Sequence, residues 1–134
     1  MRIVAQLDEY YHAHIFGYFT CDQFRRPKPI HLLVDTECTI TTLLSDDVTR
    51  LGINCTGLNQ APPTSTANGL VVPFILPNAN FILEVQNVWF NRNNIFSTAH
   101  LDEIRCSQPT HPQHMTPQRI VRACSILGMD FLRY

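Results

Sequence analysis

One acidic residue, Asp35, stands where a carboxylate could do chemistry. It directly follows the apolar run of residues 30–34 and opens the sequence DTECTITTLL, which is rich in small hydroxyl residues. Burying a carboxylate at a strand end without hydrogen bonds costs roughly several kcal/mol. We therefore expect it to be satisfied by backbone amides, by a second carboxyl group or by nearby hydroxyls, those of Thr36, Thr39 and Thr41. The plainer alternative is an aspartate that caps a turn at the strand end.

The elements that must position Asp35 are short strands. Nine prolines and five glycines divide the 134 residues into short pieces, which favours strands over long helices. Residues 2–19 and 30–35 are apolar and β-prone, and the sequence FRRPKP between them is typical of an exposed turn. LVVPFIL and NFILEVQNVWF predict two further strands, separated by Pro77-Asn78. We expect an all-β fold and a single domain over residues 1–134.

One short helix and one hairpin interrupt this β pattern. In SDDVTRLGI, Ser45 is a candidate N-cap, two carboxylates follow it, and Gly52 closes the segment, which predicts about two helical turns near residues 45–51. The polar stretch 57–69 ends in Asn68-Gly69, a strong hairpin signal. We expect a flexible hairpin over residues 62–72 that stands out of the β body.

The segment 91–122 is the hardest to interpret. Its part STAHLDEI fits one or two helical turns, whereas CSQPTHPQHMTPQR contains three prolines and reads as a loop. The segment is therefore predicted to be an ordered insertion or a loop.

Composition and charge exclude two classes of partner. The formal net charge is -1, and ten Lys and Arg residues are spread along the chain without forming the basic stripe that nucleic acids require. No apolar run approaches the roughly 20 residues that span a bilayer. The polar start MRIVAQLDEYYHAH is not built like a secretory signal. We expect no nucleic-acid partner, no membrane partner and a cytoplasmic location.

Several cysteine and histidine residues of this sequence are side chains that could bind a metal. The five cysteines are odd in number, widely spaced and without a C-x-x-C pair, so we expect them in the core rather than in a disulfide framework. Cys106 lies near His111 and His114 in sequence, and His12 and His14 alternate along one segment. None of these spacings matches a structural zinc pattern, so we predict neither a metal nor a cofactor.

Three sequence motifs of this chain resemble, in residue type and in order, motifs of a known protein family. LLVDTECTITTLL followed by LSDDVTRLGI resembles the Asp-Thr-Gly-Ala-x-x-Thr signature of retropepsin-like aspartic proteases and the short segment after it. STANGLVV resembles the tip of the substrate-covering flap in cellular members of that family. A third motif, Ile126, Leu127 and Gly128, resembles the family's hydrophobic-hydrophobic-Gly motif. Spacing and order agree from about residue 30 onward, except in the unmatched segment 91–122.

The resemblance implies a retropepsin-like closed β-barrel with a flap, and it implies a role for each matched residue. By position, Asp35 would be the catalytic aspartate, and Thr36 would make hydroxyl contacts that lock two active-site loops together across a dimer. Thr41 would support the loop, and Ile126–Gly128 would pack behind it. The other matched residues would line the active-site loop and cleft, Glu37, Cys38 and Thr39, or form the flap tip, Thr66, Ala67, Asn68 and Gly69.

The chemistry of such proteases requires two carboxyl groups, and this chain supplies one. Two carboxyls about 3 Å apart share one proton, so one acts as base toward water while the other acts as acid toward the carbonyl. Asp35 is the only aspartate followed by Thr or Ser. The second carboxylate must then come from another copy, so we expect a two-fold homodimer. The function implied is an aspartic endopeptidase that acts on peptide or protein substrates.

Glu37 stands where the family has glycine. Its side chain would crowd the cleft, and in a dimer it would bring two more carboxylates near the catalytic pair, where like charges disfavour ionisation. Two functions therefore remain open. One is an aspartic endopeptidase, and the other is a catalytically impaired dimeric module that keeps the groove and flap and binds peptides without hydrolysing them.

The sequence also departs from the retroviral relatives at an ion pair and at the C-terminal strand of the dimer interface. Met129 and Thr39 occupy the places of an Arg–Asp ion pair in retroviral relatives, so both partners are absent together and no lone buried charge is left. Tyr134 follows soon after the Gly128 motif, so we expect no long C-terminal interface strand. The interface would be built instead from the N-terminal strands or the segment 91–122.

Overall fold

The computed structural model describes residues 2–66, 69–86, 95–107 and 125–132. The first half contains β1 (Arg2–Ile3), β2 (Gln6–Leu7), β3 (Ala13–Thr20), β4 (Lys28–Val34), β5 (Thr42–Leu43) and α1 (Ser45–Leu51). The second half contains β6 (Thr64–Thr66), β7 (Gly69–Val71), β8 (Phe74–Gln86), β9 (Ile95–Cys106), β10 (Ser125–Leu127) and α3 (Met129–Leu132).

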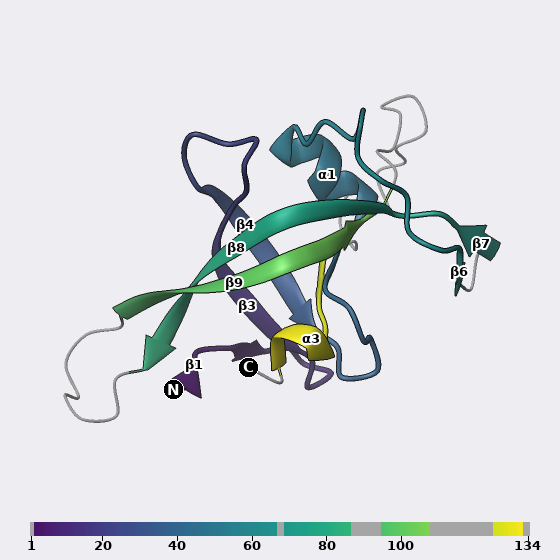
Figure 1. Cartoon of the computed structure of the whole chain (residues 1–134). Helices are drawn as coiled ribbons and strands as arrows, with labels where there is room; N and C mark the ends of the chain where they lie inside the picture. The colour runs from purple at the N-terminus through teal and green to yellow at the C-terminus, as the bar shows by residue number, and fades with distance from the viewer. Residues whose placement is uncertain (1, 67–68, 87–94, 108–124, 133–134) are drawn as a thin grey trace.

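Six of these strands close into a barrel. Hydrogen-bonded neighbours run in the order β8-β9-β5-β10-β4-β3, and β3 also pairs with β8, which completes the ring. The short strands β1 and β2 pair antiparallel with β8 and β3 respectively. Figure 1 shows the long β8–β9 ribbon crossing over β3 and β4, with α1 on one side and α3 on the other. The predicted all-β fold and closed barrel are confirmed.

The barrel closes tightly where β3 crosses β8. Gly17 lies opposite Leu83, and a Cβ atom built on Gly17 would stand 2.5 Å from the Ile82 carbonyl oxygen and 2.8 Å from Leu83 Cδ2. Beside this contact the core aromatics Phe19 and Phe81 are fully buried, with ring centroids 5.2 Å apart. Glycine at position 17 therefore permits the close approach that seals the core.

One strand prediction was wrong in detail. Pro77-Asn78 does not separate two strands, because β8 runs through both residues and keeps one register against β9, with Asn78 at φ 55°. Proline is tolerated there since β3 joins β8 only from Asn80 onward, so the Pro77 nitrogen faces no second ladder. The β-prone residues 2–19 contribute to three strands, β1, β2 and β3, with a turn at Asp8–His12 in which Tyr11 has φ 63°.

The segment STAHLDEI, residues 97–104, is strand and not helix. It lies inside β9, whose twelve residues pair with β8. The buried Leu101 and Ile104 fit helical spacing as well as a twisted strand, and the pairing with β8 decides between them. The prediction of helical turns over residues 97–104 is therefore wrong, and residues 95–106 are not a loop.

Helix α1 occupies the predicted residues, Ser45–Leu51, but begins differently. Leu44 is the N-cap residue and makes no side-chain capping bond, so the predicted Ser45 cap is wrong. Gly52 ends the helix as expected, at φ 73°, with its N–H donated to the Thr49 carbonyl at 3.1 Å. No helix in the described part of the chain is long and apolar enough to cross a bilayer.

The closure of the barrel at Gly17 can be tested by substitution. Gly17→Ala should lower the free energy of unfolding by about 3 kcal/mol, because the Ile82 carbonyl is backbone and cannot rotate away. Gly57→Ala is the matched control, since a Cβ there meets nothing within 4 Å and only the positive φ is strained; it should cost about 1 kcal/mol. Urea denaturation measures both, and equal losses would contradict the packing argument.

Candidate active site

The loop that follows β4 holds Asp35 through its backbone and its side chain. The Asp35 N–H donates to the Leu127 carbonyl at 3.2 Å, and the Asp35 carbonyl accepts the Cys38 N–H at 3.3 Å. The Glu37 N–H donates to Asp35 Oδ1 at 2.9 Å. The carboxylate is thus oriented by the backbone of its own turn, and its side chain is half-buried at the barrel end.

Strand β10 passes directly behind this loop. It pairs in parallel with β4, Leu127 opposite Val34, and antiparallel with β5, Ile126 opposite Thr42. At its end, a Cβ on Gly128 would stand 2.7 Å from the Ile40 carbonyl carbon. Only glycine permits this approach without a shift of the loop backbone.

A buried hydroxyl fixes the position of the loop relative to β10. Thr41 is fully buried, its Oγ1 donates to Asp130 Oδ1 at 2.7 Å, and it accepts the Gly128 N–H at 3.0 Å. The same Asp130 oxygen accepts the N–H groups of Thr41, at 2.9 Å, and of Phe131, at 2.8 Å. Asp130 therefore closes the loop from behind, a role that sequence reasoning did not assign.

A second buried network ties α1 to the same strand. Asp47, placed by sequence among the acids of the first helical turn, accepts the hydroxyl proton of the fully buried Ser125 and bonds to Arg50 Nη2 at 2.9 Å. The Ser125 hydroxyl also accepts the Leu44 N–H at 3.0 Å. Ser125 and Asp47 thus fix the helix that follows the active-site loop against β10.

Two of the four predicted flap residues, Thr66 and Gly69, belong to the paired strands β6 and β7. Thr66 pairs with Gly69, and Ala67 and Asn68 lie outside the described residues. The next residue, Leu70, is 75% exposed. The hairpin projects from the barrel at the start of β8 (Figure 1).

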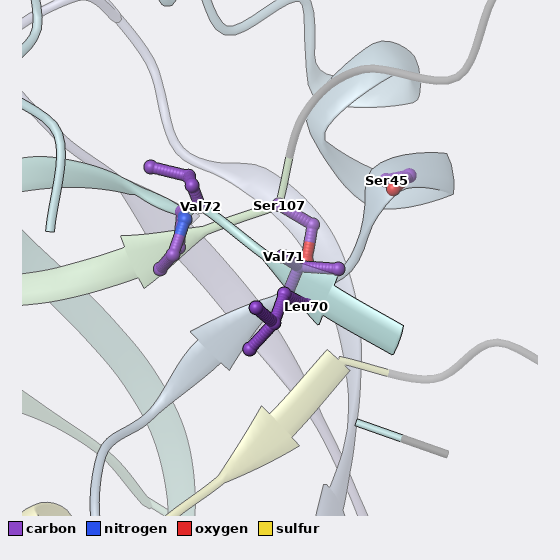
Figure 2. Close-up of a pocket in the computed structure, with 6 residues that line it drawn as sticks. Ser45, Leu70, Val71, Val72 and Ser107 are labelled. Carbon is purple, nitrogen blue, oxygen red and sulfur yellow. The ribbon is translucent and has the colours of Figure 1, made fainter. Parts of the chain in front are cut away.

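A cavity of about 360 Å³ lies at the base of this hairpin. Its lining comes from β7, from the start of α1 and from the chain just after β9, and comprises Ser45, Leu70, Val71, Val72, Pro73 and Ser107. Figure 2 shows Leu70, Val71 and Ser107 together, with Ser45 on the helix facing them. The cavity is apolar with two hydroxyls, which suits an uncharged side chain.

The other predicted loop residues differ in exposure. Thr36, Glu37 and Thr39 are exposed, and among the described residues the side chains of Thr36 and Glu37 make no hydrogen bond or ion pair. Thr39 contributes its carbonyl, which accepts the Asp130 N–H at 3.1 Å. Cys38 is half-buried, and its thiol donates to the Ile40 carbonyl at 3.0 Å. The loop is therefore anchored on its inner side and open on its outer side.

The described cysteines and histidines do not gather into a metal site. Cys21 and Cys106 are buried in the core, and burial raises the pKa of Cys106 to about 12, so that thiol stays protonated and unreactive. His111 and His114 lie outside the described residues. Within the described ranges, no group of three or more His, Cys, Asp or Glu side chains is arranged to hold a metal ion.

The fold of the chain matches that of a solved structure. The chain is similar to the crystal structure of a retropepsin-like aspartic protease from Rickettsia conorii, with a TM-score of 0.53 and 19% sequence identity, over 98% of this chain and 76% of that chain. The fold is that of a retropepsin-like aspartic protease. No family model matches the sequence, and no curated protein matches it.

Two substitutions distinguish the hydrogen-bond acceptor of Asp130 from its negative charge. Asp130→Ala should lower the free energy of unfolding by about 3 kcal/mol, because two backbone N–H groups and the Thr41 hydroxyl lose their common acceptor. Asp130→Asn should cost about 1 kcal/mol, since an amide oxygen can still accept from all three donors. Equal losses in urea denaturation would show that the charge, and not the acceptor, supports the loop.

Proposed function

We propose that the chain is an aspartic endopeptidase whose active form is a homodimer, with one Asp35 from each subunit in a catalytic pair. The observation that carries the proposal is the position of Asp35. It stands at the end of β4 in a retropepsin-like barrel, on a loop held from behind by Thr41 and Gly128 and open in front. The fold supplies one such carboxylate, so the pair needs a second copy.

Hydrolysis would follow from the shared proton. One Asp35 carboxylate removes a proton from water as the water oxygen attacks the carbonyl carbon of the substrate. The other Asp35 donates its proton to the carbonyl oxygen, and collapse of the tetrahedral intermediate breaks the C–N bond as the amine nitrogen is protonated. Since this requires one proton on the pair, activity is expected to be highest at acidic pH.

The residues around the pair have supporting roles in this proposal. The Glu37 N–H holds Asp35 Oδ1, so the second carboxylate oxygen can face the partner subunit. The exposed Thr36 hydroxyl would bond across the two-fold axis, and the β6–β7 hairpin would cover the substrate. The cavity beneath it would accept an uncharged substrate side chain. A cytoplasmic location is part of the proposal and is checked by cell fractionation.

Replacing the catalytic aspartate tests the proposal directly. Asp35→Asn should reduce cleavage of a peptide library at pH 4 to 6 by at least about 10³-fold, because an amide neither accepts nor donates the transferred proton. The fold should be unchanged, since the amide oxygen can still accept the Glu37 N–H. Cleavage by the variant at the rate of the unmodified protein would exclude Asp35 from catalysis.

The exposed side chain of Glu37 favours a second candidate, the dimeric peptide-binding module. If the chain is a protease, Glu37→Gln should keep activity and move its pH optimum downward, because removing the extra negative charges eases ionisation of the pair, which then holds its single proton at lower pH. Glu37→Gly then removes the steric part as well. If the unmodified dimer binds peptides and cleaves none, while Glu37→Gly cleaves them, the binding module is the correct function.

A further inference from the structure

A chain of three titratable side chains lies on the outer face of the barrel, apart from the Asp35 loop. Asp8 Oδ2 accepts a hydrogen bond from His14 Nε2 at 2.8 Å, and His14 Nδ1 lies 2.7 Å from His31 Nε2. The chain runs from the turn after β2, through β3, to β4. It is partly shielded from water, with the side chain of His14 20% exposed and that of Asp8 30%.

The two carboxylate oxygens of Asp8 have different partners. Oδ1 accepts the backbone N–H groups of Tyr10, at 2.8 Å, and of His12, at 2.9 Å, and so closes the turn. Oδ2 takes the bond from His14 and lies 3.3 Å from His12 Nδ1. The bond from His14, followed by those backbone bonds, holds the pKa of Asp8 well below its ordinary range, so this group stays ionised.

The proton count of the two rings follows from these bonds. A carboxylate only accepts, so His14 carries a proton on Nε2, and neutral His14 offers its Nδ1 lone pair to a proton on His31 Nε2. One added proton on His14 Nδ1 reverses the direction of that bond and places a cation beside Asp8. A second proton, on His31, puts hydrogens on both facing nitrogens, which lie 2.7 Å apart, and the bond cannot survive.

We infer that Asp8, His14 and His31 form a proton-operated contact between the hairpin of residues 6–14 and strand β4, closed with no or one added proton and opened by two. Besides this contact, β2 pairs with β3 through Gln6 with His14 and Leu7 with Ala13, and the Asp8 N–H donates to the His12 carbonyl at 3.1 Å. The same hairpin exposes Leu7, Tyr10 and Tyr11. Because His14 lies opposite Leu33, the contact sits at the end of the sheet that carries Asp35.

The electrostatic surroundings set the pH at which the contact opens. Burial, followed by the charge on His14, lowers the pKa of His31 below its ordinary value of 6.5, and Asp47 on α1 acts in the opposite direction. The closed form therefore binds fewer protons than the opened form. Its stability is complete above pH 6.5 and falls as the pH drops from 6.5 through the lowered pKa of His31. This inference does not depend on the proposed catalysis.

Hydrogen exchange tests the contact in the intact chain. The protection factors of the Tyr10 and His12 amides, both bound to Asp8, should fall by up to about tenfold per pH unit between pH 6.5 and the lowered pKa of His31 and level off below it, because opening takes up one proton in that window. His31→Gln keeps a neutral hydrogen-bonding group at the ring position, so its protection should stay flat over the same range. His100→Gln is the matched control, since His100 bonds to Asn80 on another part of the barrel, and it should behave as the unmodified chain.

Nuclear magnetic resonance of the imidazole rings gives an independent readout. In His14→Gln, the titration midpoint of His31 should rise, since the neighbouring positive charge that lowers the pKa of His31 is gone. The inference is overturned if that midpoint does not move, or if amide protection in the unmodified chain is the same at pH 7.5 and pH 4.5. A fall in protection that His31→Gln retains in full would overturn it as well.

Discussion

The buried hydroxyl of Thr41 joins parts of the chain that are 87 residues apart, and the geometry of the candidate active-site loop depends on that junction. It accepts the Gly128 N–H while donating to Asp130, so β10 is pinned directly behind the loop that carries Asp35. A hydroxyl can accept and donate at once, which lets one short side chain make both bonds. Gly128 completes the junction, because any side chain there would push the Ile40 carbonyl carbon and hence the loop.

This anchoring explains why the loop is rigid on one side and chemically open on the other. Its inner carbonyls, those of Cys38 and Thr39, bond to the backbone at the start of α3. Its outer side chains, Thr36 and Glu37, point away from the barrel and are exposed. A surface of this kind suits isologous pairing, because two copies that meet there bring their two Asp35 residues to a common axis. The contact that the proposed chemistry requires is therefore compatible with the fold of the single chain.

The sequence predicted the local part of this arrangement better than the distant part. Asp35 after an apolar strand, α1 with Gly52 at its end, and a hairpin around Asn68-Gly69 are short-range patterns, and each element formed where expected, although Asn68 itself lies outside the described residues. Asp130 was missed because its main partner, Thr41, is 89 residues away. The strand β9 was misread because its apolar spacing also fits a helix, and only pairing with β8 decides the matter.

The partners of buried polar groups were likewise not predicted, because they are distant in the sequence. Asp47 in the first turn of α1 suggested a favourable interaction with the helix dipole, yet the structure uses it to hold Ser125, 78 residues away. A carboxylate near the start of a helix suggests a dipole interaction when only the sequence is known, whereas a buried one needs specific donors. The signal that could have found this pair is Ser125 itself, a small polar residue directly before the apolar Ile126-Leu127.

The central claim is that two copies of Asp35 form one site, and the stoichiometry of a transition-state mimic tests it most directly. A statine-type inhibitor carries one hydroxyl that must sit between both carboxyl groups. Calorimetric titration at pH 5 is predicted to give one inhibitor bound per two chains, with binding lost in Asp35→Asn. One inhibitor per chain, or unchanged binding by Asp35→Asn, would contradict the shared site.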